Sequence, residues 1–294
     1  MPILLQVLPL WLDAGDFYVI LSCFLMLLMR IDYHIHTPLC NHATSTPMQI
    51  TERALELDIS EIGFAEHSPW MIQGKSKMAP SFEELEWYFG DIKELQKRYN
   101  GKSPLTIRLG MEMDYHPSTL SYVEQYSRMP FIDFVIGSIH YMGFWTYDIF
   151  DQARLFNTLG VRKAYEEYFA RIIDLVRTGL FDVVGHIDII KLEGVRPEGG
   201  YRDLKEKVAD VLADSGMVVE FNTSGYDRPV GEPFPDVEFL RILKERNVPV
   251  TLSSDCHTAE QMGRYFDRAL DILRSVGYTE LITFDKRRKI PAAL

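Results

Sequence analysis

Short, nearly continuous apolar runs alternate along the chain with longer segments of helical periodicity. After Arg30, strands are expected at 31–37, 61–65, 105–113, 131–139, 181–185, 217–221, 248–254 and 281–284. Helices are expected at 47–57, 82–99, 118–126, 162–178, 203–215, 236–246 and 259–276, and an aromatic-rich loop at 141–156. Strands that are apolar on both faces are typical of a parallel sheet covered by helices.

The alternation of strand and helix fixes the expected fold class. It repeats about seven times, and no Gly-rich dinucleotide turn interrupts it. We therefore expect an α/β fold built as a closed or distorted barrel rather than a doubly wound sheet. No linker, repeat or low-complexity tract follows Arg30, so one domain over 29–294 is the simplest organisation.

The first 28 residues do not join this pattern. Residues 17–29 are apolar, but a run of 13 residues is shorter than the roughly 20 that span a bilayer. The segment lacks a basic start and a clear cleavage site, so it is a poor signal peptide. We expect residues 1–28 to be an apolar extension outside the fold, with a membrane-associated anchor as the alternative.

Composition narrows the function classes. The net charge of −11, without a long basic run, argues against nucleic acid as the main partner. The three cysteines, Cys23, Cys40 and Cys256, contain no Cys-x-x-Cys pair. A small, odd number of cysteines is typical of proteins in a reducing compartment and favours a cytoplasmic protein.

Most of the histidines fall where an expected strand ends. His34 and His36 lie two positions apart on one strand, so both rings point to the same face. The other strand-end histidines are His67, His140, His186 and His257, and His42 lies in the first loop. Glu112 and Asp255 also end strands. In a barrel these ends meet on one face, which is where barrel enzymes carry their chemistry.

Seven imidazoles and two carboxylates brought together in this way favour a site for several metal ions. So many titratable groups are costly to bury together unless cations coordinate and neutralise them. Mixed imidazole and carboxylate ligands suit Zn, Mn or Fe, and the sequence does not choose among the three.

These residues carry a resemblance to a known family. His34-x-His36, His42, Glu66-His67, Gly110-Met-Glu112, Gly137-Ser-Ile-His140, Gly185-His186 and Ser254-Asp-x-His257 resemble the metal motifs of the PHP (polymerase and histidinol phosphatase) superfamily. Glu220-Phe-Asn-Thr-Ser-Gly225, Arg228-Pro-Val-Gly-Glu232 and the closing Phe284-Asp-Lys-Arg-Arg resemble its histidinol-phosphate phosphatase branch. The resemblance runs from about Arg30 to the C-terminus.

The resemblance implies a distorted (β/α)7 TIM-like barrel with three divalent ions at the C-terminal ends of the strands. The implied first ion is held by His34, His36, Glu112 and Asp255, the second by Glu112, His140 and His186, and the third by His42, His67 and His257. Glu112, Asp255 and His257 are the implied catalytic residues.

The implied reaction is hydrolysis of L-histidinol phosphate to L-histidinol and phosphate, in histidine biosynthesis, by attack of a metal-bridging hydroxide. The expected partner is therefore a small phosphate monoester. A basic side chain from a strand-end loop is expected to bind the phosphate, with Arg228 as the first candidate and Lys191 or Arg196 as the second.

Other readings stay open at this point. A PHP enzyme could act on another phosphoester, such as phosphotyrosine or a small nucleotide. A metal-dependent amidohydrolase also begins with His-x-His and ends with a strand-borne Asp, but it usually lacks counterparts of His42, His67 and His257. A polymerase-associated accessory module without turnover is a further alternative, although no ligand position is substituted. The oligomeric state is not indicated.

Overall fold

The structure, a computed structural model, describes residues 30–69, 78–143 and 147–294. The expected extension at 1–28 lies outside these residues, so that extension and the domain boundary at residue 29 stay predictions. Within the described residues, we find no helix that combines the length and apolar character needed to cross a membrane.

Seven parallel strands form the central sheet, in the order β1-β2-β3-β4-β7-β8-β9. Their bounds are β1 Ile31–Ile35, β2 Glu61–His67, β3 Thr106–Asp114, β4 Phe134–Ser138, β7 Val183–Val184, β8 Val218–Asn222 and β9 Val250–Ser253. The order of the strands in the sheet is their order in the chain, as expected for successive β-α units. The predicted α/β barrel is confirmed.

The barrel is almost closed where β9 meets β1. Just past β9, Cys256 forms an isolated parallel bridge to Ile35. The His36 amide donates to the Cys256 carbonyl at 3.0 Å, and the Cys256 amide donates to the His34 carbonyl at 3.2 Å. The end of β9 therefore lies beside β1, the strand that contains His34 and His36. The barrel is irregular because β7 has only two residues.

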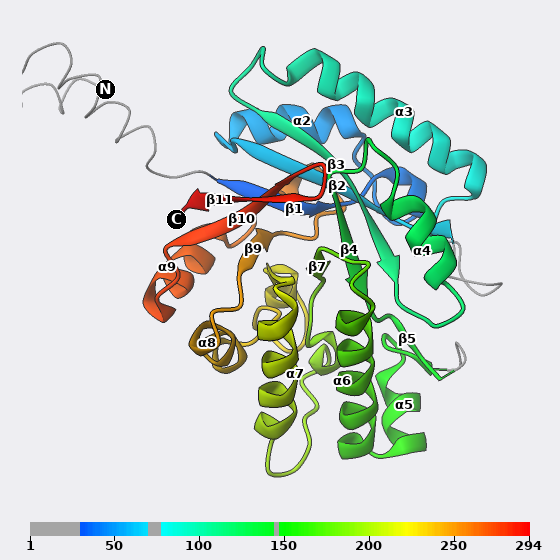
Figure 1. The fold of residues 1–294 in the computed structure, drawn as a ribbon, viewed down its shortest axis with the longest axis vertical. Coiled ribbons are helices and arrows are strands. Elements are labelled where there is room, and N and C mark those ends of the chain that lie inside the picture. The colour runs from blue at the N-terminus through cyan, green and yellow to red at the C-terminus, as the bar shows by residue number, and fades with distance from the viewer. Residues whose placement is uncertain (1–29, 70–77, 144–146) are drawn as a thin grey trace, which may run out of the picture.

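Helices lie around the outside of the sheet (Figure 1). Their bounds are α2 Pro47–Glu56, α3 Phe82–Tyr99, α4 Leu120–Ser127, α5 Gln152–Leu159, α6 Val161–Thr178, α7 Arg202–Ser215, α8 Val237–Glu245 and α9 Phe266–Val276. Two of them begin at capping boxes, Thr46 with Gln49 for α2 and Ser81 with Glu84 for α3. Such boxes are readable from the sequence, and both helix starts match the prediction.

The structure differs from the expected elements in three places. The segment predicted as a loop contains β5 (Tyr141–Met142), β6 (Tyr147–Asp148) and the start of α5, whose first turn is capped by Asp151. The helix predicted from residue 259 begins only at Phe266, because Gly263 adopts a left-handed φ of +64° and interrupts it.

The third difference is at the C-terminus. The strand predicted at 281–284 is β10 (Glu280–Asp285), which pairs with β11 (Arg288–Ala293) in a separate hairpin. Lys286 and Arg287 form its two-residue turn, both with positive φ, the geometry that such tight turns require. Arg287 donates to the carbonyls of Ser127 and Leu180, at 2.8 and 2.7 Å, so the hairpin is fastened to segments that precede β4 and β7.

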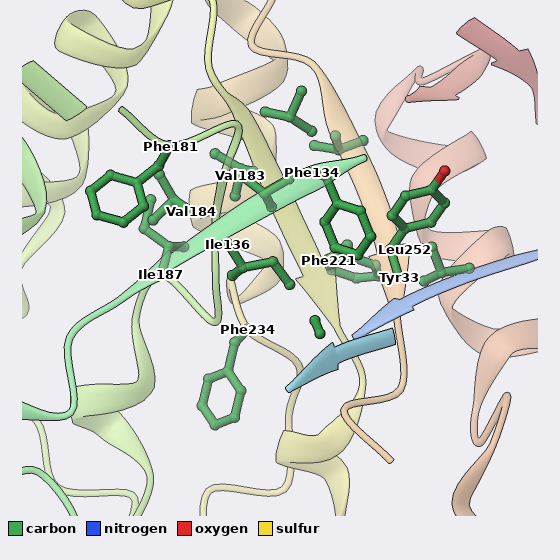
Figure 2. Packing of buried hydrophobic residues seen from close by; sticks show 14 of the residues in the cluster. Tyr33, Phe134, Ile136, Phe181, Val183, Val184, Ile187, Phe221, Phe234 and Leu252 are labelled. Atoms are coloured by element: carbon green, nitrogen blue, oxygen red, sulfur yellow. The ribbon is translucent and has the colours of Figure 1, made fainter. Parts of the chain in front are cut away.

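The end of the barrel opposite the histidines is filled by aromatic side chains. Phe134 and Tyr33 are almost fully buried, with ring centroids 4.9 Å apart, and Figure 2 shows the two rings close together. Gly63 and Gly110 on the neighbouring strands make room for the Phe134 ring, because an added Cβ would lie 2.7 and 2.4 Å from it. This packing sets the distance between the strands that carry the histidines.

We expect Gly110→Ala to destabilise the fold by about 1–3 kcal/mol through overpacking, and Phe134→Ala by about 3–5 kcal/mol through a cavity. In the double variant the ring no longer opposes the methyl group, so the effects should fall short of their sum by about 1 kcal/mol or more. Urea unfolding of the four proteins measures this. Gly90→Ala on α3, where a Cβ meets nothing within 4 Å, is the control and should not destabilise. Additive effects would contradict the packing described.

Candidate metal centre

The nine predicted ligands converge at the C-terminal ends of the strands. A cavity of about 700 Å³ opens there, and eight of the nine line it. The exception, His34, is fully buried beneath the cavity floor. His42 is exposed at the outer side, whereas His36, His140 and His186 are buried. The strand-end placement predicted from the sequence is therefore what the structure shows.

Glu112 stands at the centre of this cluster. Its Oε2 lies 2.7 Å from His67 Nδ1, 3.3 Å from His34 Nε2 and 3.6 Å from His36 Nε2. Its Oε1 lies 3.0 Å from His186 Nε2 and 3.5 Å from His140 Nε2. One carboxylate thus faces two groups of imidazoles with different oxygens, which is the arrangement a bridging ligand needs.

The cluster divides into sets that could each hold one ion. In each set, potential ligand atoms lie within 4.8 Å of one another. Three of these sets are His34 with His36 and Asp255, Glu112 with His140 and His186, and His42 with His67 and His257. They contain the residues of the predicted ligand sets, which stay predictions, and Glu112 adjoins the first set through the contacts just given. His36 also groups with His67 and Glu112, and with Cys40 and His257.

Several buried polar atoms of the cluster have no hydrogen-bond partner. They are His34 Nε2, His36 Nδ1, His67 Nδ1, His186 Nδ1 and Glu112 Oε2. Each unsatisfied buried group costs about 1–3 kcal/mol, so such a concentration needs another kind of partner. Lone pairs of imidazole and carboxylate at these spacings fit divalent cations, with Zn, Mn and Fe the best matches to the donor set.

The imidazoles differ in protonation in the absence of a cation. Burial would lower the pKa of His36 and of His140, but adjacent carboxylates outweigh it and raise both to about 9. Asp255 and Glu66 act on His36, and Asp114 and Glu112 on His140. Burial also opposes the rise at His34, whose pKa Glu220 and Glu112 hold well above its usual value.

The outer imidazoles behave in the opposite way. Burial is the largest cause that lowers the pKa of His67 to about 4 and that of His257 to about 2, and the neighbouring His36 lowers both further. The pKa of His42 is lowered as well, mainly because its ring is partly desolvated by the neighbouring side chains, although the residue is exposed at the outer side. At neutral pH these three rings are neutral and ready to donate a lone pair.

Carboxylates behind the imidazoles were missed as functional residues in the sequence. Asp114 Oδ2 lies 3.2 Å from His140 Nδ1, and its Oδ1 accepts from the His140 amide at 2.9 Å. Asp114 follows Glu112 by two positions on one strand, so strand periodicity could have identified it. Glu66 was noted only as part of a motif, yet it lies 3.6 Å from His36 Nδ1 and accepts from the Thr37 amide at 2.8 Å.

The three basic side chains predicted to bind the phosphate do not all lie at the cavity. Arg228 lines the cavity, but Lys191 and Arg196 do not. Lys191 is fully buried, with Nζ 2.9 Å from Asp188 and 3.0 Å from Glu232, and Arg196 also pairs with Glu232. Their charges are therefore already compensated, and the assignment of Lys191 and Arg196 to the phosphate is corrected.

The cavity wall contains other residues that the sequence did not indicate. Arg264 donates to the Ser254 carbonyl at 2.7 Å, to the Asp255 carbonyl at 3.1 Å and to the Asp227 carboxylate at 2.9 Å. Apolar lining comes from Phe150, Phe234, Met78, Ile189 and Leu192. Most of these residues belong to segments far apart in the chain, so their place in the cavity wall follows from the fold and not from local spacing.

Comparison with known proteins agrees with this geometry. The model of the PHP domain family matches residues 32–224. A probable histidinol-phosphatase of Deinococcus radiodurans is 35% identical over 261 residues, which cover 88% of this chain and 98% of the relative. The chain belongs to the PHP domain family.

Two further relatives match this chain over almost their whole length. The histidinol-phosphatase of Bacillus subtilis is 28% identical, covering 83% of this chain and 99% of its own. The structure of the histidinol phosphate phosphatase of Lactococcus lactis, in complex with zinc, L-histidinol and phosphate, superposes with a TM-score of 0.77 at 25% identity. It covers 89% of this chain and 99% of its own, and the resemblance stated from the sequence is confirmed.

Metal loading should release protons. At pH 7 the rings of His34, His36 and His140 hold protons that a cation has to displace, whereas the outer rings hold none. We expect about three protons released per protein on saturation with Zn²⁺ at pH 7, and fewer as the pH approaches 9. Calorimetric titrations in buffers of different ionisation enthalpy measure the number. Zn²⁺ binding at pH 7 with no net proton release would contradict the described electrostatics.

Proposed function

We propose that this PHP-domain protein is a divalent-metal-dependent phosphatase that hydrolyses L-histidinol phosphate to L-histidinol and phosphate. The observation that carries the proposal is the convergence of seven imidazoles and the carboxylates of Glu112 and Asp255 at one cavity of about 700 Å³. Relatives named histidinol-phosphatase align over almost their entire length and support the substrate. The enzyme therefore belongs to the phosphoric monoester hydrolases and to histidine biosynthesis.

The proposed ligand sets follow the three spatial groups. His34, His36 and Asp255 with Glu112 would hold one cation, Glu112 with His140 and His186 a second, and His42 with His67 and His257 a third. Zn, Mn and Fe all suit these donors. When bound, such ions activate water at neutral pH and neutralise charge on the phosphoryl oxygens.

Asp255 and His257 contribute to the site through their place after β9. Asp255 has a left-handed φ of +51°, and its Oδ2 accepts from Asn222 and Ser224, each at 3.3 Å, so that Oδ1 faces His36 at 3.4 Å. Because the pKa of His257 is about 2, this ring holds no proton to give to a leaving group. Its role in the proposal is that of a ligand in the outer set.

Arg228 is the proposed phosphate-binding side chain. Its guanidinium lines the cavity and makes no hydrogen bond or ion pair with any residue within 30–69, 78–143 or 147–294. Arg264 is the second cation of the wall, but Asp227 and two carbonyls already occupy its donors. A bidentate arginine suits a phosphate dianion, and an uncompensated one offers the larger gain.

The rest of the cavity suits the histidinol part of the substrate. The Phe150 and Phe234 rings supply apolar surface for an imidazole, and Asp227 is a carboxylate at the half-exposed rim, outside the cluster of predicted ligands. Because L-histidinol carries an ammonium group, Asp227, which already pairs with Arg264 and accepts from the Tyr265 hydroxyl, would share its negative charge with that group. A ligand with phosphate at one end, an imidazole at the other and an ammonium between them thus meets matching groups along the cavity.

A reducing cytoplasmic location is part of the proposal. The two cysteines within the described residues, Cys40 and Cys256, are buried and unpaired. A net charge of −11 is unsuited to a nucleic-acid partner, so a small phosphate monoester is the proposed partner.

Phosphate release from L-histidinol phosphate, p-nitrophenyl phosphate and phosphotyrosine tests the function. We expect selective turnover of L-histidinol phosphate by protein loaded with Zn²⁺ or Mn²⁺, and loss of turnover after EDTA treatment. His257→Ala should reduce kcat/KM by about 100-fold or more, because it removes a ligand from the outer set. Arg228→Met should mainly raise KM, by about 10–100-fold, at unchanged metal content.

The control is His116→Ala, since this histidine lies outside the cavity lining, and its turnover should match that of the unchanged protein. If only the other esters are hydrolysed, the proposed metal chemistry stands, but the proposed substrate is replaced by a different phosphoester. A protein that binds metal but hydrolyses none of the esters would contradict the proposal and favour an amidohydrolase or an accessory module.

A further inference from the structure

Glu220, on β8, is a buried carboxylate that takes no part in the proposed ligand sets. It is fully buried and does not line the cavity. The side chain is therefore a polar group enclosed by protein beneath the floor of the site, and both of its oxygens need hydrogen-bond donors.

Four donors surround the Glu220 carboxylate. Oε1 lies 2.6 Å from His34 Nδ1 and accepts from Ser253 Oγ at 2.5 Å. Oε2 accepts from the His186 amide at 2.5 Å and from Asn222 Nδ2 at 3.0 Å. A carboxylate has about four lone-pair positions, so no position remains for a cation.

We propose that Glu220 is the positioning residue of the metal centre, which orients ligands from three different strands without touching the ions. The inference rests on the proposed function insofar as that function requires the bound metal. It extends beyond the ligand sets, because it names the group that fixes how those ligands face the cations.

The first ligand that Glu220 orients is His34. Because the Glu220 carboxylate accepts from its other three donors, it also accepts from Nδ1 of His34, which keeps its proton, and Nε2 is the nitrogen left to bind a cation. That Nε2 is one of the buried atoms without a hydrogen-bond partner, and it lies 3.3 Å from Glu112 Oε2. Carboxylates that fix the tautomer of a ligating histidine in this way strengthen metal binding.

The second ligand is His186, through its backbone. His186 has a φ of +20°, which is unfavourable for a residue with a side chain, and the preceding Gly185 has no room for a Cβ. The hydrogen bond from the His186 amide to Glu220 holds this turn. In the resulting conformation His186 Nε2 lies 3.0 Å from Glu112 Oε1.

The third connection reaches Asp255 through Asn222. The Asn222 Nδ2 group donates to Glu220 Oε2 and also lies 3.3 Å from Asp255 Oδ2. Glu220 is thus linked to ligands that follow β7 and β9 and to one within β1. The set of His34, His36 and Asp255 and the set of Glu112, His140 and His186 therefore both depend on Glu220. The outer set, His42 with His67 and His257, does not contact it.

The experiment compares Glu220→Gln with Glu61→Gln. Glu61 is a matched control, because it is also a nearly buried carboxylate with several partners, Tyr33 and Arg108, but it begins β2 at the opposite end of the barrel. Both variants should lose unfolding free energy in urea. Only Glu220→Gln should also weaken Zn²⁺ binding, by about 10–100-fold in competition with a chelator. Its kcat/KM should recover with excess Zn²⁺ while KM for the ester stays unchanged.

Equal Zn²⁺ affinity in Glu220→Gln and in the unchanged protein would overturn the inference and leave Glu220 a purely structural residue. If the unchanged protein binds no Zn²⁺, the proposed function fails instead, and the two failures are thereby distinguished.

A second measurement needs no variant. Nitrogen NMR of the unchanged, Zn-loaded protein reports the state of each His34 nitrogen. We expect a protonated Nδ1 and a metal-shifted Nε2. A metal-shifted Nδ1 would overturn the inference even if Glu220→Gln does not fold.

Discussion

The structure depends on one electrostatic constraint, the Glu112 carboxylate buried among five imidazoles. Burial penalises a charged carboxylate, yet the pKa of Glu112 is held well below its usual value by His34, His67 and His140. Without cations the cluster is balanced only by protons on some of these rings, and several buried donor atoms remain unpaired. Divalent ions would resolve both problems at once, which supports the proposal that the residues that look costly to the fold hold cations.

Packing at the amino ends of the strands holds the barrel together, so that the charged cluster can lie at the carboxyl ends. Phe134 packs between the glycines of β2 and β3, and the C-terminal hairpin fastens segments that precede β4 and β7. These contacts lie at the amino ends of the strands, so they set strand spacing without occupying the cavity. Above them, carboxylates such as Asp114 and Glu220 set the orientation of individual rings. Stability and chemistry are thereby separated along the barrel axis, as is general for barrel enzymes.

The sequence predicted the fold and the nine clustered side chains well, because both follow from periodicity. The strand period of two places His34 and His36 on one face, and parallel strands bring their ends to one edge. Contacts between distant segments were not predictable in this way. Lys191 looked available for phosphate, since nothing local reveals that Glu232 folds onto it. Glu220 was visible only within a motif, and its partners come from β1, the segment after β7, and β9 as well as from its own strand.

The most direct test of the account is anomalous X-ray diffraction from crystals of the Zn-loaded protein. We expect three peaks, each within about 2.0–2.3 Å of its proposed ligands: the first among His34, His36, Glu112 and Asp255, the second among Glu112, His140 and His186, and the third among His42, His67 and His257. Glu220 should stay outside the coordination distance of every peak. Peaks elsewhere, or a Glu112 carboxylate that contacts no ion, would contradict the claim that this buried cluster exists to hold cations.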